Sequence, residues 1–199
     1  MFFCGGEYLV NNGCPWYNIY VFYKGAFAMT MLFPALLAVA AIAADQWSKA
    51  WIAAHYADYV AQYLAAPDRF YGVPSSAHLP VLSGVVHWTF QPNTGAAFSF
   101  GAGRTWFFIL VTFVFFGVVA YALHKKWFTG ASLWGLALVV GGAVGNLIDR
   151  VARGFVVDMI EVEFIRFPVF NVADCCICVG AAVIVLAVLL EDKKHETDR

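Results

Sequence analysis

The feature that most limits how this chain can fold is the presence of four long stretches without a charged residue. A helix needs about 20 residues to cross about 30 Å of hydrocarbon, because each residue adds about 1.5 Å. Backbone polar groups in lipid need internal hydrogen-bond partners, so stretches of this kind are expected to be helices. They cover residues 25–44, 105–123, 127–148 and 175–190.

The fourth stretch is too short to cross a membrane by itself. Residues 175–190 make a helix of about 24 Å, so the spanning helix has to begin before residue 175. This places Asp174 at or just below the membrane surface, where an ionisable group is costly and is by default a functional candidate. We predict membrane spans over about 29–48, 105–123, 127–148 and 173–190.

The composition leads to the same class of protein. The chain is 62% hydrophobic and 13% charged, whereas a soluble domain has about 45–50% apolar and about 25% charged residues. A net charge of −1 offers no strongly basic face for nucleic acid. Four spans put both termini on one side, and the lysine pairs 125–126 and 193–194 indicate that this side is cytoplasmic. Lys49 and five arginines lie on the other side and weaken this assignment of the cytoplasmic side.

Residues 50–104 are predicted to form an outer lobe. Residues 50–65 are amphipathic, with aromatic residues among alanines, and favour an interfacial helix, while the β-branched and aromatic run 81–90 favours strand pairing. Asn93-Thr94-Gly95 is typical of a turn. The expected fold is therefore mainly α and integral to the membrane: a four-transmembrane-helix bundle with a small extracytoplasmic β-containing lobe and an interfacial helix.

The expected domain covers residues 29–192 and is followed by a cytoplasmic tail, 193–199. Residues 1–28 fit no span or motif and are taken as an N-terminal extension. No cleavable signal peptide is evident.

Ionisable and amide side chains gather at one end of the predicted spans. Asp45 and Lys49 are four residues apart on one helical face and are expected to pair. Asp149 and Arg150 end the third span and are equally well explained as helix caps.

Asp158 and Asp174 are the most informative of these acids. Two carboxylates that converge in a low-dielectric cleft cannot both ionise easily, so one of them keeps a proton. Such a pair supplies one base to activate water and one acid to protonate a leaving amine. The alternative from spacing alone is a pair of capping acids.

The sulfur-containing residues of the last span are a weaker signal. Cys175 and Cys178 have C-x-x-C spacing and Cys176 adds a third thiol, but no fourth metal ligand follows nearby. A free cysteine in an apolar helix is usually a small hydrophobic residue, so we interpret the three as packing residues. No histidine has a Ser or Cys partner in a recognisable hydrolase motif.

Five polar motifs follow one another along the chain. In this order they resemble the lipoprotein signal peptidases of bacteria, also called signal peptidase II or prolipoprotein signal peptidases. The resemblance covers residues of about 30 to 190. The motifs are D-Q-W-S-K at 45–49, N-T-G-A-A-F-S at 93–99, G-G-A-V-G-N-L-I-D-R at 141–150, G-F-V-V-D-M-I at 154–160 and F-N-V-A-D at 170–174.

The resemblance implies a role for each matching residue. Asp158 and Asp174 match the catalytic aspartates of the family. The remaining matches imply residues that line the active site and orient the substrate and the aspartates, or that shape the site: Asn93, Asn146, Arg150, Asn171, Asp45 and Lys49. Cys175-Cys176 departs from the small pair that usually follows the second aspartate, and residues 50–80 look longer than usual.

The resemblance also implies an activity. The expected enzyme is an intramembrane aspartic endopeptidase of the bacterial inner membrane, multi-pass, with its active site near the outer-leaflet surface. Its substrate is a prolipoprotein that carries diacylglycerol on its lipobox cysteine, cut on the amino side of that cysteine. The expectation includes contact with membrane lipid, no metal or other cofactor, inhibition by globomycin-type peptides, and a monomer.

Two other classes of protein compete with this interpretation. A proton-coupled transporter that uses Asp158 and Asp174 as relay groups predicts polar groups in both leaflets, or repeated halves. Here the polar groups cluster on one side and no repeat is visible. A membrane scaffold without activity gives no reason for five polar motifs to converge.

Overall fold

The computed structural model describes residues 15–95 and 103–197 of the chain, which divides into two units. Residues 1–33 form one unit, and its described part is the first portion of the long helix α1, Pro15–His55. Residues 34–199 form the other unit and carry every element discussed below. Part of the expected N-terminal extension and residues 96–99 of the second polar motif lie outside the described residues.

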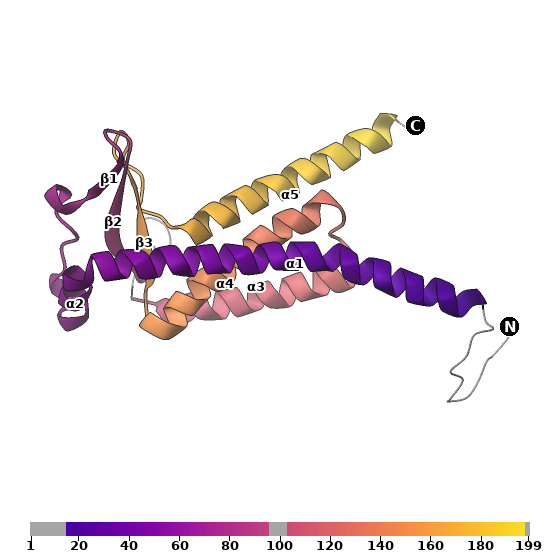
Figure 1. Cartoon of the computed structure of the whole chain (residues 1–199), viewed down its shortest axis with the longest axis horizontal. Helices are drawn as coiled ribbons and strands as arrows, with labels where there is room; N and C mark the ends of the chain where they lie inside the picture. The colour runs from indigo at the N-terminus through magenta and orange to yellow at the C-terminus, as the bar shows by residue number, and fades with distance from the viewer. Residues whose placement is uncertain (1–14, 96–102, 198–199) are drawn as a thin grey trace. The chain divides into compact units, whose positions relative to one another are not determined.

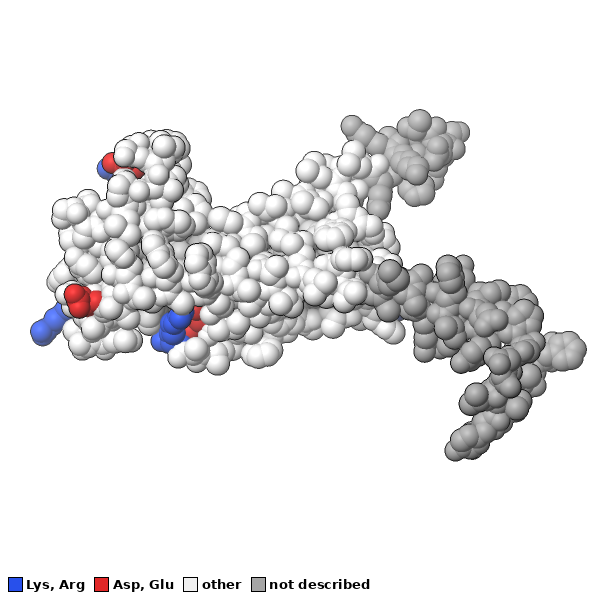
Figure 2. All heavy atoms as spheres, viewed as in Figure 1, with Lys and Arg blue, Asp and Glu red and all other residues white. Residues whose placement is uncertain are grey.

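The described residues contain four helical segments long and apolar enough to cross a membrane, which confirms the mainly helical membrane fold (Figure 1). Helix α5 begins at Val172, three residues before the uncharged stretch. On the face drawn in Figure 2, the charged side chains lie over the end that carries the sheet. The segments are Thr30–His55 of α1, Thr105–His124 (α3), Ala131–Arg153 (α4) and Val172–Leu190 of α5, which as a whole covers Val172–Thr197.

Helices α4 and α5 approach each other closely because glycines face the contact. A Cβ atom on Gly135 would lie 2.6 Å from the carbonyl oxygen of Gly180, and one on Gly142 would overlap the carbonyl oxygen of Ala173. In membrane proteins, small residues at a helix contact allow the two backbones to approach this closely. The contact fixes the start of α5, with Asp174, against the middle of α4.

A three-stranded antiparallel sheet in the order β1-β2-β3 lies beside the start of α5 (Figure 1). The strands are β1 (Leu79–Leu82), β2 (Val86–Asn93) and β3 (Val156–Val162). The strand pairing predicted over 81–90 is confirmed: a turn with Gly84 at φ +76° joins β1 to β2, and the two strands pair antiparallel. Asn93 ends β2, where it pairs with Val156, and it also begins the predicted turn, because its Oδ1 accepts the backbone N–H of Gly95 at 2.9 Å.

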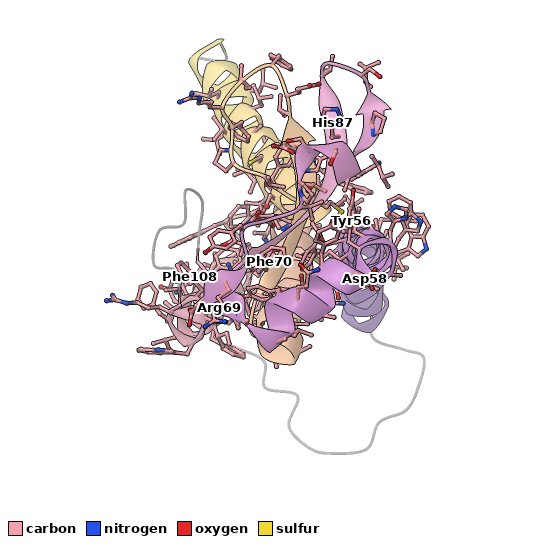
Figure 3. All side chains as sticks on the ribbon, turned by 90° about the vertical axis from the view of Figure 1, so that its left-hand side faces the viewer. Tyr56, Asp58, Arg69, Phe70, His87 and Phe108 are labelled. Carbon is pink, nitrogen blue, oxygen red and sulfur yellow. The ribbon has the colours of Figure 1, made fainter. Side chains whose placement is uncertain are left out.

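Helix α2 (Ala57–Ala65) and the sheet enclose a separate hydrophobic core. The predicted helix over 50–65 is also corrected, because α1 continues to His55 and only the remainder forms α2. Tyr56 lies at the junction, and its hydroxyl donates to the carbonyl oxygens of Ala77 and Trp88. Figure 3 views this lobe from its outer end, with Tyr56 labelled. The buried residues of this hydrophobic core are Ile52, Tyr56, Phe90, Phe155, Val157 and Met159.

Candidate active site

Asp158 lies on β3 and is almost completely buried, with 2% of its surface exposed. Both of its carboxylate oxygens accept a hydrogen bond from an amide side chain. Asn93, at the end of β2, donates from Nδ2 to Oδ2 at 2.8 Å, and Asn171 donates from Nδ2 to Oδ1 at 2.6 Å. The sheet register holds Asn93 and β3 side by side, so this contact follows directly from strand pairing.

Asp174 lies in the first turn of α5, where its carboxylate closes a reciprocal cap with Asn171. The backbone N–H of Asp174 donates to Asn171 Oδ1 at 3.0 Å, and the backbone N–H of Asn171 donates to Asp174 Oδ2 at 3.2 Å. This is the geometry of a capping box with aspartate in the third helical position. Oδ1 remains for another partner and accepts a bond from Asn146 Nδ2 at 2.9 Å. The capping interpretation of Asp174 thus holds for one oxygen only.

One amide group connects the two acids. Asn171 is fully buried, and its Nδ2 donates to Asp158 Oδ1 and to Asn146 Oδ1, the latter at 3.2 Å. Its Oδ1 accepts the backbone N–H of Asp174. Each carboxylate therefore accepts a hydrogen bond from Asn171, Asp158 from the side-chain amide and Asp174 from the backbone N–H.

Burial sets the protonation of Asp158. The loss of solvent around its carboxylate, with a further contribution from the negative charge of Asp174, raises its pKa from 3.8 to about 7. The hydrogen bonds from Asn93 and Asn171 act in the opposite direction and limit the rise. Near neutral pH the pair can therefore keep one proton, as a general acid and a general base require.

A buried lysine forms ion pairs with two carboxylates near this pair. Lys49 Nζ lies 2.8 Å from Asp45 Oδ2 and 3.1 Å from Asp149 Oδ2, and all three side chains have no exposed surface. It also donates to Asn146 Oδ1 at 2.9 Å. Arg153 adds a second cation 2.6 Å from Asp149. The expected pairing of Asp45 with Lys49 is present, and Asp149 is an ion-pair partner rather than a simple cap.

The two carboxylates beside Lys49 also hold the backbone that carries the catalytic candidates. Asp45 Oδ1 accepts the N–H of Ala173 at 2.9 Å, and Asp149 Oδ2 accepts the N–H of Val157 at 3.1 Å. Each donor is the residue immediately before one of the two central aspartates. The ion cluster therefore fixes the positions of both acids through the main chain, not through direct contact with them.

Arg150 lines the same cavity as the two acids. It donates from Nη2 to the carbonyl oxygen of Gly95 at 2.9 Å, and its guanidinium lies 5.3 Å from the centre of the Phe108 ring. Its Nε is buried and has no hydrogen-bond partner among the described residues. A buried polar atom without a partner is unusual in a folded protein, so this side chain is a candidate for a role in the site.

A cavity of about 1410 Å³ opens onto the two acids. Its lining includes Asp158, Asp174, Asn93, Asn146 and Arg150 at one end. Apolar side chains of three helices form its walls, among them Val111 and Phe115 of α3, Val139 of α4 and Ile177 of α5. An apolar cavity with a few convergent polar groups is the usual form of a ligand site.

The comparisons with known proteins agree with one another. The family model described as Signal peptidase (SPase) II matches residues 37–190. The chain belongs to the signal peptidase II family. Within that peptidase family, the lipoprotein signal peptidase of Lactococcus lactis subsp. lactis (strain IL1403) is 35% identical over 163 residues, covering 82% of this chain and 97% of the relative. The lipoprotein signal peptidase of Listeria monocytogenes serotype 4b (strain F2365) is 36% identical over 163 residues, covering 80% and 94%.

Solved structures support this membership of the signal peptidase II family. A bacterial membrane enzyme determined by the in meso method at 2.3 Å resolution superposes with a TM-score of 0.65 and 26% identity. The match covers 81% of this chain and 90% of that one. A second such structure, at 1.9 Å resolution, gives a TM-score of 0.61 and 28% identity over 79% and 92% of the two chains.

All of the site residues predicted for this signal peptidase II chain lie in one connected network. Asn146 is its centre, because it contacts Lys49, Asn171 and Asp174. Arg150 joins through a bond of 3.4 Å from Nη1 to the Asn146 carbonyl oxygen. Gln46 was not predicted; it donates to Asp45 and to the carbonyl oxygen of Gly145, and its place beside Asp45 in D-Q-W-S-K was its only signal.

The cysteines are placed differently from the expectation. Cys178 is exposed and lines the cavity together with half-buried Cys175, so the packing interpretation fails for Cys178. Cys176 is half-buried and does not belong to that lining. Among the described residues, no group of three His, Cys, Asp or Glu side chains is placed to hold a metal ion.

Proposed function

We propose that this chain is an intramembrane aspartic endopeptidase that removes signal peptides from diacylglyceryl-modified prolipoproteins. The observation that carries the proposal is the position of Asp158 and Asp174. Both carboxylates accept a hydrogen bond from Asn171, one from its side-chain amide and one from its backbone N–H, and both aspartates line a largely apolar cavity between membrane-spanning helices. Membership of the signal peptidase II family supports the same activity.

The reaction uses one proton held by the two acids. The ionised carboxylate removes a proton from a water molecule, whose oxygen attacks the scissile carbonyl carbon. The protonated carboxyl then gives its proton to the leaving amine as the carbon–nitrogen bond breaks. The raised pKa of Asp158, about 7, makes it the carboxyl that holds the proton before reaction. Asp174 is then the base.

The neighbouring polar side chains keep the acids and the peptide in place. Asn93 and Asn171 fix the two oxygens of Asp158, and Asn146 fixes the free oxygen of Asp174. Arg150 lines the cavity, and its guanidinium donates to a carbonyl oxygen of the substrate backbone. Asp45 and Lys49 act through the main chain and the amide of Asn146, so they are positioning residues.

The cavity explains why the substrate carries a lipid. Its walls include apolar side chains of helices α3, α4 and α5, so acyl chains can occupy it while the peptide bond lies beside the acids. Cleavage on the amino side of the lipidated cysteine keeps that cysteine with its acyl chains. We place the site near the outer leaflet of the bacterial inner membrane, with both termini cytoplasmic, and expect a monomeric enzyme that globomycin-type peptides inhibit.

The decisive experiment compares two forms of one prolipoprotein, with and without diacylglycerol on the lipobox cysteine. Purified full-length protein in lipid vesicles should cleave only the modified form. Mass spectrometry should then find a signal peptide that ends at the residue before the cysteine, and globomycin should stop its release. Equal cleavage of the unmodified form, or a cut elsewhere, would contradict the proposal.

A further inference from the structure

Three thiols on the first two turns of α5 do not all face the same surroundings. Cys175 and Cys178 are three residues apart and therefore share one face of the helix. Both belong to the lining of the cavity, whereas Cys176 does not. The proposed cleavage chemistry uses none of these sulfur atoms. The cavity thus contains two nucleophilic groups without an assigned role.

The surroundings select the kind of reagent that can reach these thiols. Val139 and Ile177 belong to the same cavity wall, so an uncharged apolar molecule enters without losing strong hydration. A charged molecule loses its hydration there and is disfavoured. Cys178 is exposed and Cys175 is half-buried, so access is greater at Cys178.

We propose that Cys175 and Cys178 form a covalent modification site for small, uncharged, lipophilic electrophiles of the α,β-unsaturated carbonyl class. The sulfur forms a bond to the β-carbon of the electrophile and the carbon–carbon double bond becomes single. The thiol proton ends on the α-carbon, so no oxidant or other reactant is needed. Cys178 reacts faster because it is the more exposed of the two thiols.

The two adducts have different consequences because the thiols lie at different depths. Cys175 directly follows Asp174, so an adduct there lies where the scissile peptide has to approach. Cys178 lies about one turn further along α5, beside the apolar walls of the cavity. An adduct at Cys178 narrows the space for acyl chains and should raise KM more than it lowers kcat.

Labelling with N-ethylmaleimide tests the site directly, independently of any proteolysis. The full chain with Cys4→Ala and Cys14→Ala confines the reaction to the three thiols of α5, and peptide mass spectrometry gives the rate at each. We expect Cys178 to react at least about tenfold faster than Cys176, with Cys175 between them. A maleimide that carries a sulfonate should react at least about tenfold more slowly than N-ethylmaleimide at Cys178.

Activity provides the second readout and rests on the proposed function. Each variant is compared with its own untreated rate, before and after N-ethylmaleimide. The Cys175→Ala/Cys178→Ala variant should become resistant, while Cys176→Ala should stay as sensitive as the parent. The proposed site would be contradicted if Cys176 were labelled fastest, or if the sulfonated maleimide and N-ethylmaleimide reacted with Cys178 at equal rates. Selective labelling at Cys178 without any peptidase activity in untreated protein would contradict the proposed function alone.

Discussion

Replacing Lys49 with methionine should lower the free energy of unfolding, because it leaves a buried carboxylate without its cation. Met is close to Lys in length, so the change removes the charge while it keeps most of the volume. Asp149 retains Arg153 at 2.6 Å, but Asp45 keeps only the N–H of Ala173 and the weaker contact with Gln46 at 3.2 Å. The unpaired charge therefore falls mainly on Asp45, which has no exposed surface.

Removing one partner of a buried ion pair costs about 3–5 kcal/mol, and we expect about 3 kcal/mol here because Asp149 stays paired. SDS titration in mixed micelles measures the free energy of unfolding. The matched control is Asp45→Asn/Lys49→Met, in which the amide oxygen can still accept the Ala173 N–H. This double variant should recover about 2 kcal/mol relative to Lys49→Met. A double variant that loses the sum of the two single losses would refute the reasoning.

Three further predictions concern the pH profile, the helix contact and the N-terminal residues. Asn93→Leu removes a hydrogen bond that lowers the pKa of Asp158. The alkaline limb of the pH profile of kcat/KM, expected near pH 7, should therefore move upward by about one pH unit. An unchanged alkaline limb in a pH–rate series would argue against Asp158 as the acid. In the parent, the raised pKa means that Asp158 contributes its full stability in acid and loses it as pH rises through about 7. Gly142→Ala forces a methyl group against the Ala173 carbonyl and should reduce both folding stability and activity, whereas Gly117→Ala, with nothing within 4 Å of the new atom, should leave thermal unfolding unchanged. A chain that starts at Met29 should cleave the lipidated substrate at the full-length rate; a tenfold loss would show that residues 1–28 contribute.

The membrane spans could be predicted from the sequence because hydrophobicity and helix length are local properties of the chain. The start of the last span before residue 175 followed from the length of one apolar stretch, and α5 begins at Val172. The sheet was less accessible, because its register depends on pairing between β2 and β3, which are more than 60 residues apart. The sequence around Asp158 showed no alternation that would have marked β3, since both of its neighbours are buried valine and methionine.

The supporting residues were the hardest to predict. Asp149 occupies the last turns of α4, where a cap or dipole partner is the ordinary explanation for an acid near arginine. Its role depends on contacts with Lys49 and the N–H of Val157, which only the folded chain brings together. The same reason explains the cysteines: an apolar helix predicts packing, and the cavity that Cys178 lines is formed by segments that are distant in the sequence.

The central claim is that Asp158 and Asp174 form the catalytic pair, and single substitutions test it most directly. Asp158→Asn and Asp174→Asn are close in size to the parent side chains, and each removes one titrating group. Cleavage of diacylglyceryl-modified prolipoprotein by each variant is compared with that of the parent at equal amounts of folded protein. We predict that kcat falls about 100- to 10,000-fold in both variants. Cleavage by either variant at the parental rate would contradict the claim.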